Sequence, residues 1–150
     1  MGISEQLMIR PVTNNDAEWL NELLSDEEVR RFMPHIERNA DRLIASMLKA
    51  DERGLGYMKI ISFESTPAGF IAVYDINDNP FLFYAMRKSF RNKGIMTGVI
   101  KSMIPTLPVS ITTLIHEDNK ASRRVIAKSG LLKIKMVSMI RTVCKCEKYI

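Results

Sequence analysis

The first third of the chain has apolar residues at helical spacing after one short extended segment. Residues 7–12 are mostly apolar and are predicted to form a strand. Thr13 with Asp16 three positions later is typical of a capping box, and Leu20 and Leu24 continue the apolar stripe of the helix that it opens. A second helix is predicted from Asp26 to just before Pro34, and a third over residues 37–50. The chain therefore begins with one strand and three helices.

From residue 57 onward the pattern favours strands. Segments 57–63 and 69–74 are predicted to pair as a hairpin through a turn at 65–68, and residues 75–80 to form a second turn. Segment 81–86 is continuously apolar, which indicates a central strand covered on both faces. The remaining predicted elements are a helix from Ile95 to Pro105, a strand at 109–115, a helix between Asn119 and Gly130, and strands at 131–140 and 141–149. Asn119 is expected to cap the helix that follows it. In that helix the residues expected to face inward are Ala121, Ser122, Val125 and Ile126, and those expected to form a solvated outer face are Lys120, Arg123, Arg124 and Lys128.

This order of elements predicts an α/β chain in which a mixed sheet has parallel pairing near its middle. A strand–helix–strand–helix segment after a meander gives the parallel pair, and the other strands are expected to be antiparallel. The length of 150 residues suits one domain with one core, so residues 1–150 are treated as a single domain.

Composition and charge restrict the class of ligand. Apolar residues make up 46% and charged residues 26% of the chain, and the net charge is +5 without a long basic run. A modest, dispersed excess of cations favours small anionic ligands at least as much as nucleic acid. Neither a signal peptide nor a membrane span is recognisable, so we expect a cytoplasmic protein without a membrane partner.

The two cysteines lie near the C-terminus, two positions apart. On a strand this spacing puts Cys144 and Cys146 on one face, which is a poor geometry for a disulfide between them. A zinc site would need further ligands, and the only histidines are His35 and His116. We expect two reduced thiols and no metal site.

The basic turn after the central strand is a candidate anion site. Arg91, Asn92, Lys93 and Gly94 lie where the turn becomes a helix. A helix start presents backbone N–H donors and the positive end of the helix dipole, and Gly94 lets a ligand approach the backbone. These features suit a phosphate group, although the glycine-rich dinucleotide and P-loop fingerprints are absent.

Two segments together resemble one known family. Arg91-Asn92-Lys93-Gly94 is similar to the pyrophosphate loop of the GNAT superfamily of acyl-CoA-dependent N-acyltransferases, and NKASRRVIAKSGL at 119–131 is similar to its second cofactor motif. Thr97 and the Asn119/Ser122 pair look most like the branch that contains the ribosomal-protein N-terminal acetyltransferases. The resemblance implies a mostly antiparallel sheet of about seven strands, flanked by helices and splayed open at its central parallel pair.

The resemblance also implies roles in binding acetyl-CoA or coenzyme A. Backbone N–H groups from Arg91 to Thr97 would hold the pyrophosphate, and the exposed backbone at Met86 and Arg87 would bind the pantetheine arm. Asn119 would contact the cofactor, with Ser122 near its sulfur. The implied cofactor-binding residues are Met86, Arg87, Arg91, Asn92, Lys93, Gly94, Ile95, Met96, Thr97, Asn119 and Ser122.

Acyl transfer to an amine by direct attack in a ternary complex needs a neutral amine, a donor for the oxyanion and a proton for the thiolate. The Met86 N–H is the candidate oxyanion donor. The Ser122 hydroxyl either donates a proton to the leaving thiolate or forms a hydrogen bond to a carbonyl of its own helix. The candidate bases are Asp75, Asp78, His116 and Glu117. An α-amino group, with a pKa of about 7.7–8.0, needs less help than a lysine at about 10.4.

Four positions depart from the family pattern, and the mildest departure is Leu131 in place of the usual Phe after Gly130. Met96 stands where Gly or Ala is usual, which predicts a tighter loop or displaced phosphates. Ile126 replaces a tyrosine that acts as general acid in many members, and Phe81 replaces a frequent acidic residue. These departures support a second hypothesis, a coenzyme A-binding regulatory module without catalysis. A small basic nucleic-acid-binding domain is a third hypothesis, which the dispersed charge disfavours.

The sequence leaves the acceptor open. It is a protein N-terminus or a small-molecule amine. The sequence does not decide between a monomer and a homodimer. His35 either borders an acceptor pocket or is simply exposed.

Overall fold

The protein is described here by a computed structural model, which covers residues 6–108, 110–135 and 141–148. The helices are η1 (Asn14–Asp16), α1 (Ala17–Leu24), α2 (Glu27–Phe32), α3 (Ala40–Glu52), η2 (Lys88–Phe90), α4 (Ile95–Met103), η3 (Ile104–Thr106) and α5 (Lys120–Lys128), where η marks a 3-10 turn. The strands are β1 (Leu7–Pro11), β2 (Gly56–Phe63), β3 (Thr66–Ile76), β4 (Asn79–Met86), β5 (Ser110–His116), β6 (Leu131–Lys135) and β7 (Arg141–Lys148).

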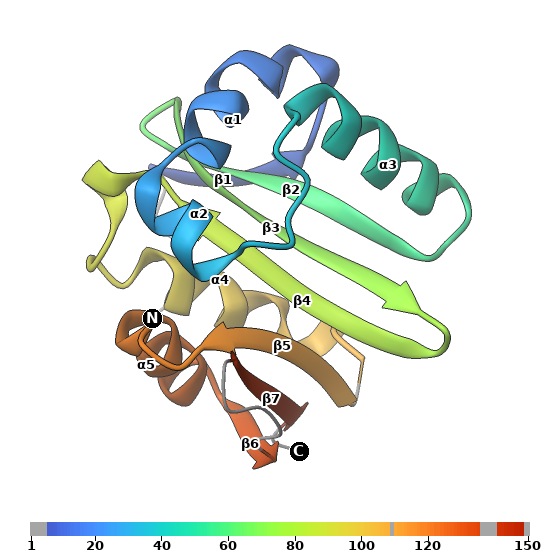
Figure 1. Ribbon diagram of the computed structural model, residues 1–150, viewed down its shortest axis with the longest axis vertical. Helices are drawn as coiled ribbons and strands as arrows, with labels where there is room; N and C mark the ends of the chain where they lie inside the picture. Colours follow the sequence, from blue (N-terminus) through green and yellow to red (C-terminus); the bar gives the residue numbers. More distant parts are fainter. Residues whose placement is uncertain (1–5, 109, 136–140, 149–150) are drawn as a thin grey trace.

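These strands form one seven-stranded sheet in the order β1-β2-β3-β4-β5-β7-β6. Every neighbouring pair is antiparallel except β4 and β5. The parallel pair is joined only at Phe81 and Thr112, and beyond that point the two strands diverge toward the side where α2 lies (Figure 1). The predicted mixed sheet, splayed at its central parallel pair, is confirmed.

Helices cover both faces of this sheet. The helices α1, α2 and α3 pack on one face, where Leu24, Val29 and Ile44 belong to one apolar cluster with Phe70 of β3. The helices α4 and α5 pack on the other face, where Ile100 and Ile126 belong to a second apolar cluster. The continuously apolar segment in β4 is explained by its central position, because alternate side chains enter the two clusters.

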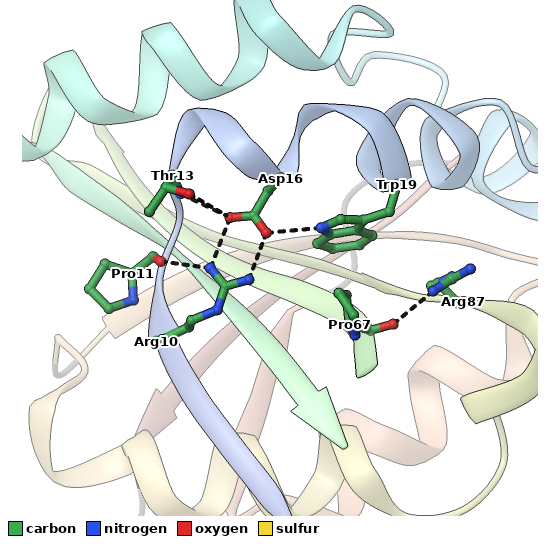
Figure 2. Close-up of polar contacts among 7 residues, drawn as sticks. All are labelled: Arg10, Pro11, Thr13, Asp16, Trp19, Pro67 and Arg87. Carbon is green, nitrogen blue, oxygen red and sulfur yellow. Dashed lines mark hydrogen bonds and ion pairs between the residues drawn. The ribbon is translucent and has the colours of Figure 1, made fainter. Parts of the chain in front are cut away.

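A buried carboxylate joins the first strand to the first helix (Figure 2). Asp16 is only 2% exposed. It accepts hydrogen bonds from both terminal nitrogens of Arg10 (2.9 and 2.7 Å), from the Thr13 backbone N–H (2.9 Å) and from the Trp19 ring N–H (2.9 Å). Burial alone would raise the pKa of Asp16, but these bonds outweigh it and lower the pKa from 3.8 to about 2. The predicted capping box is therefore also the anchor between β1 and α1.

The predicted turns and one helix start were wrong in detail. The hairpin turns are the residue pairs Glu64–Ser65 and Asn77–Asp78, all four with positive φ, so Thr66 and Pro67 belong to β3. A bulge near Ser62 accommodates Pro67, which cannot donate to the sheet. The third helix begins at Ala40 rather than residue 37, because the Asn39 side chain caps it by accepting from the Arg42 N–H.

Some predictions fall outside the described residues. Val109 and residues 136–140 are among these, so the C-terminal strand pair is seen only as β6 and β7. The prediction that Cys144 and Cys146 are reduced thiols also falls outside what the structure describes, because only the backbone of β7 is described. Among the described helices, none is long and apolar enough to cross a membrane.

Candidate functional site

The loop between β4 and α4 presents a concave run of backbone donors. Asn92 and Gly94 have φ of +60° and +75°. Gly94 is the N-cap residue of α4, and as a glycine it offers no side-chain acceptor to the first N–H groups of the helix. Within the described part of the chain, the backbone N–H groups from Asn92 to Thr97 donate to no acceptor. A Cβ placed on Gly94 would meet nothing within 4 Å, so open space lies over the loop. This geometry suits an anion held by main-chain donors.

This loop forms one end of a groove of about 960 Å³ that passes between the diverging strands. Helices α2, α4 and α5 form its other walls. Cationic side chains that line it without an ion pair to any described residue are Lys88, Lys93, Lys120, Arg124 and Lys128. The groove is therefore strongly cationic and suits a ligand with several phosphates.

The sequence prediction for α5 needs correction. Arg124 and Lys128, expected to form a solvated outer face, line the groove together with Lys120, because positions four apart share a face of the helix. Ala121, expected to face inward, is exposed. Asn119 caps the helix by accepting from the Ser122 N–H at 3.1 Å, as predicted from its position.

The Arg91 side chain does not point into the groove as a free cation. Its Nε donates to the Met86 carbonyl (2.9 Å), and its terminal nitrogens contact Asp26 (2.9 Å) and Glu28 (3.0 Å). Asp26 is also the N-cap of α2. Burial alone would raise the pKa of Asp26, but the hydrogen bonds from Arg91 and from the α2 backbone lower it. Arg91 thus ties the cofactor loop to α2, which sequence reasoning did not predict.

The family departures at Met96 and Ile126 are accommodated in the core. Both side chains are buried, at 4% and 2% exposure, within the apolar cluster under α4 and α5. The Met96 side chain therefore leaves the open space over Gly94 intact. Phe81 is partly buried and lines a second cavity, described below.

The two residues expected to bind the pantetheine arm, Met86 and Arg87, direct their backbone N–H groups to opposite sides of β4. Arg87 donates its N–H to the Ala68 carbonyl on β3 at 2.7 Å, and Arg87 does not line the groove. Because backbone groups of successive strand residues point to opposite sides, the Met86 N–H and carbonyl face the splay. The Arg87 N–H is therefore bonded within the sheet, whereas the Met86 N–H faces the groove between the strands.

Ser122 lies in the groove beside a tyrosine that sequence analysis missed. Its hydroxyl oxygen is 2.6 Å from the Tyr84 hydroxyl oxygen, so the two groups share a hydrogen bond. The alternative of a serine bonded back to its own helix is seen instead at Ser129, which donates to the Ile126 carbonyl. Tyr84 comes from β4 and Ser122 from the first turn of α5, so the pair bridges the splay.

A second cavity of about 700 Å³ opens on the opposite side of the splay. The segment after α2, helix α3 and strands β3, β4 and β5 supply its walls. Phe32, Met33, Phe83 and Leu114 line both the groove and this cavity, so the two meet between the strands. His35 lines the cavity, and its side chain is exposed, as the second of its two predicted placements states.

Of the four candidate bases, only His116 lines this cavity. Its ring packs on Phe32 at 5.4 Å between centroids. The Asp118 backbone N–H donates to its Nδ1 at 3.1 Å, so the neutral ring carries its proton on Nε2.

The other three candidate bases do not come to the site. Asp75 pairs with Pro80, at the opposite end of β4 from Met86, which is about 20 Å away along the strand. Asp78 lies in the exposed turn beyond it, and Glu117 is exposed. Neither cavity is lined by any of the three.

The cationic groove and the second cavity thus meet at the splayed parallel pair of an α/β sheet. A family model described as an acetyltransferase (GNAT) domain matches residues 6–132, so the chain belongs to the GNAT acetyltransferase family. The predicted family and the acetyltransferase class are confirmed. Among curated protein sequences, none matches the chain significantly.

Solved structures share the fold at low identity. An acetyltransferase from Salmonella typhimurium that modifies the N-terminal serine of ribosomal protein L7/L12 has a TM-score of 0.83 and 16% identity, covering 98% of this chain and 96% of its own. RimL, a ribosomal L7/L12 α-N-protein acetyltransferase in complex with coenzyme A, has a TM-score of 0.81 and 15% identity. The match covers 99% of this chain and 96% of RimL. Spermidine N-acetyltransferase from Vibrio cholerae, in complex with CoA and spermine, has a TM-score of 0.76 and 13% identity, and the match covers 95% of both chains.

Proposed function

We propose that this chain binds acetyl-CoA in the cationic groove and acetylates an amine that enters from the second cavity, by direct attack in a ternary complex. The observation that carries the proposal is the meeting of the two cavities at Phe83 and Leu114, between the diverging strands. In this proposal residues 1–150 act as one cytoplasmic domain, and the acceptor is a peptide N-terminus or a small-molecule amine.

The groove fits the donor through main-chain and side-chain groups. The N–H groups from Asn92 to Thr97 and the Lys93 ammonium hold the pyrophosphate, and the cations of α5 offer further contacts for phosphate. Acetyl-CoA supplies the acetyl group as a thioester. The Met86 N–H, which faces the splay, donates to the oxygen that becomes negative during transfer. The Ser122 hydroxyl donates to the leaving sulfur, with Tyr84 as its hydrogen-bond partner.

The experiment is a thermal shift assay with coenzyme A and acetyl-CoA, in which ligand at 100 times its Kd adds about 2.7 kcal/mol to the stability. Gly94→Val should abolish the shift, because its side chain would occupy the open space over the loop and φ of +75° disfavours a β-branched residue. Gly54→Val is the matched control, since Gly54 has φ of +69°, open space and no place in the groove. A retained shift in the Gly94 variant, or none in the wild type, would contradict the proposal.

The alternative function, a coenzyme A-binding regulatory module, has support in Ile126, because this buried aliphatic residue stands where many members of the family carry a tyrosine. Thiol release from acetyl-CoA in the presence of an amine and peptide panel separates the two. Release with any acceptor supports the enzyme, whereas a thermal shift without release supports the regulatory module.

A further inference from the structure

Exposed apolar side chains gather at the second cavity. Among the large apolar side chains that are exposed in the described part of the chain, Tyr74, Ile76 and Leu114 all line it. Ile76 is 47% exposed at the end of β3, and Leu114 projects from β5 on the other side of the cavity. Grouped exposed apolar side chains mark a binding surface more often than scattered ones do.

The interior of the cavity is apolar as well. Phe81, Phe83 and Met47 contribute to its wall. Glu37 is the one carboxylate among the described lining residues, and it accepts a hydrogen bond from the Asn39 N–H at 3.1 Å. Arg42 lines the same cavity with the opposite charge. A polyamine with several cations would find few partners here, whereas a bulky apolar group would be desolvated by these walls.

The chemistry of His116 restricts the amine itself. Its Nδ1 accepts the Asp118 N–H, and its Nε2 carries the proton of the neutral ring. This ring therefore offers no acceptor nitrogen to an incoming ammonium group. Asp75, Asp78 and Glu117 line neither cavity. An acceptor that is already neutral at physiological pH suits this site, and a peptide α-amine with a pKa of about 7.7–8.0 meets that condition far better than a lysine at about 10.4.

We infer that the acceptor is a peptide α-amine whose first residue has a bulky apolar side chain, and that this side chain occupies the second cavity. The inference rests on the proposed function and specifies its acceptor. The first side chain lies among Tyr74, Ile76 and Phe81, while the α-amine points to the meeting of the two cavities near Phe83 and Leu114. The volume of about 700 Å³ is ample for a leucine or phenylalanine side chain with the adjoining backbone.

The test compares tetrapeptides that differ only in their first residue, Leu or Phe against Ser, Asp or Lys, as acceptors with acetyl-CoA. We expect kcat/KM for the Leu and Phe peptides to exceed that for the Ser peptide by at least about tenfold, from burial of the larger apolar side chain. The same peptides are titrated against the coenzyme A complex by calorimetry. This binding readout requires no turnover and should give the same order.

A pair of surface variants localises the effect. Ile76→Glu places a charge at the cavity and should reduce the preference for Leu and Phe peptides about tenfold without changing the thermal shift with coenzyme A. Leu55→Glu is the matched control, because Leu55 is a similarly exposed aliphatic side chain at 40% and lines neither cavity. Its peptide preference should equal that of the wild type.

Several outcomes would overturn this assignment while leaving acetyl-CoA binding intact. These are equal binding and acetylation of Ser and Leu peptides, stronger acetylation of spermidine, an unchanged preference in the Ile76 variant, or binding of no peptide to the coenzyme A complex. Equal acetylation of phenylethylamine, a more basic amine with the same aromatic group, would overturn the choice of an α-amine. Loss of the coenzyme A thermal shift itself would instead refute the proposed function.

Discussion

The hydroxyl pair formed by Tyr84 and Ser122 is the most specific polar contact in the groove. A serine hydroxyl is a weak acid on its own, and a second hydroxyl at 2.6 Å can orient it and share its charge during proton transfer. Tyr84 therefore acts through Ser122 as a positioning residue. Ile126 cannot take that part, because it is an aliphatic side chain packed in the core.

We predict that Tyr84→Phe lowers kcat about tenfold, the equivalent of one hydrogen bond to the reacting group, and leaves the KM for acetyl-CoA unchanged. Ser122→Ala should lower kcat at least as much. The double variant should be no slower than Ser122→Ala, because the two hydroxyls act as one unit. Steady-state kinetics of the three variants provide the measurement.

Tyr57→Phe is the control for this prediction, since Tyr57 is a half-buried phenol on β2 that does not line the groove. Additive losses in the double variant would show that Tyr84 acts independently of Ser122. An equal loss in the Tyr57 variant would indicate a general effect of removing a phenol.

Sequence reasoning could select Ser122 and could not select its partner. Ser122 belongs to a recognisable motif with Asn119, whereas Tyr84 is separated from it by 38 residues and looks like any aromatic residue of a buried strand. The candidate base Asp75 was misplaced for another reason. It pairs with Pro80 in the sheet, so it lies at the end of β4 that is far from Met86, and this pairing is a long-range property.

At the level of elements, the contact between the cofactor loop and α2 depends on Arg91. Its side chain is 18% exposed and is compensated by Asp26 and Glu28, whereas Lys93, two positions later, is exposed in the groove. Two neighbouring cations that look equivalent in the sequence thus have different tasks. Arg91 holds two elements together, and Lys93 remains for the ligand.

We predict that Arg91→Ala lowers the stability by about 1–2 kcal/mol, because it removes the cation that Asp26 pairs with and the side-chain donor to the Met86 carbonyl. Lys93→Ala should change the stability by less than about 0.5 kcal/mol. The coenzyme A affinity of the wild type should fall with added salt, and Lys93→Ala should reduce that dependence, since an exposed charge is screened. Arg91→Ala should keep the salt dependence of the wild type.

Thermal unfolding and calorimetric titration at two salt concentrations measure these effects. The assignment would be refuted by the reverse pattern, in which Arg91→Ala keeps the stability and loses the salt dependence.

Element types were predictable here because apolar spacing and capping residues agree locally, as at Thr13, Asp26 and Asn119. The turns were less predictable. Ser65-Thr66-Pro67-Ala68 has the composition of a turn, but the two-residue turn at Glu64–Ser65 forms with positive φ at residues that seldom adopt it. The sheet pairing of β2 and β3 determined the turn, and that pairing is a long-range property.

For the whole molecule, the two substrate cavities differ in chemistry. The groove has most of its charge from α5 and the basic loop, and the opposite cavity has an apolar lining. The five groove cations without an ion pair to any described residue therefore lie where a phosphorylated donor would bind. The third hypothesis, a nucleic-acid-binding domain, gains no support from this distribution.

The free energy of unfolding should depend on pH through the ionisation of Asp16. The native pKa of about 2 lies below the ordinary value of 3.8, so the unfolded state binds the proton more readily. The contribution, about 2 kcal/mol, is present above about pH 4 and is lost as the pH falls toward 2. We predict that Asp16→Asn lowers the free energy of unfolding by about this amount at pH 7 and flattens its decline in acid.

Urea unfolding at pH 7, 4 and 2.5 checks this prediction, with the exposed α3 substitution Asp51→Asn as control. A variant with wild-type stability at pH 7, or with the same loss between pH 4 and 2.5 as the wild type, would contradict the role of Asp16.

Helix α2 contributes Phe32 to both cavities, and Arg91 attaches the helix to the cofactor loop. Any change in free energy that coenzyme A imposes on α2 must therefore appear in the affinity for the acceptor. By thermodynamic linkage, the acceptor then alters the affinity for coenzyme A by the same factor. The order in which the two substrates arrive can change the speed of assembly, but the product of their two dissociation constants stays the same along either route.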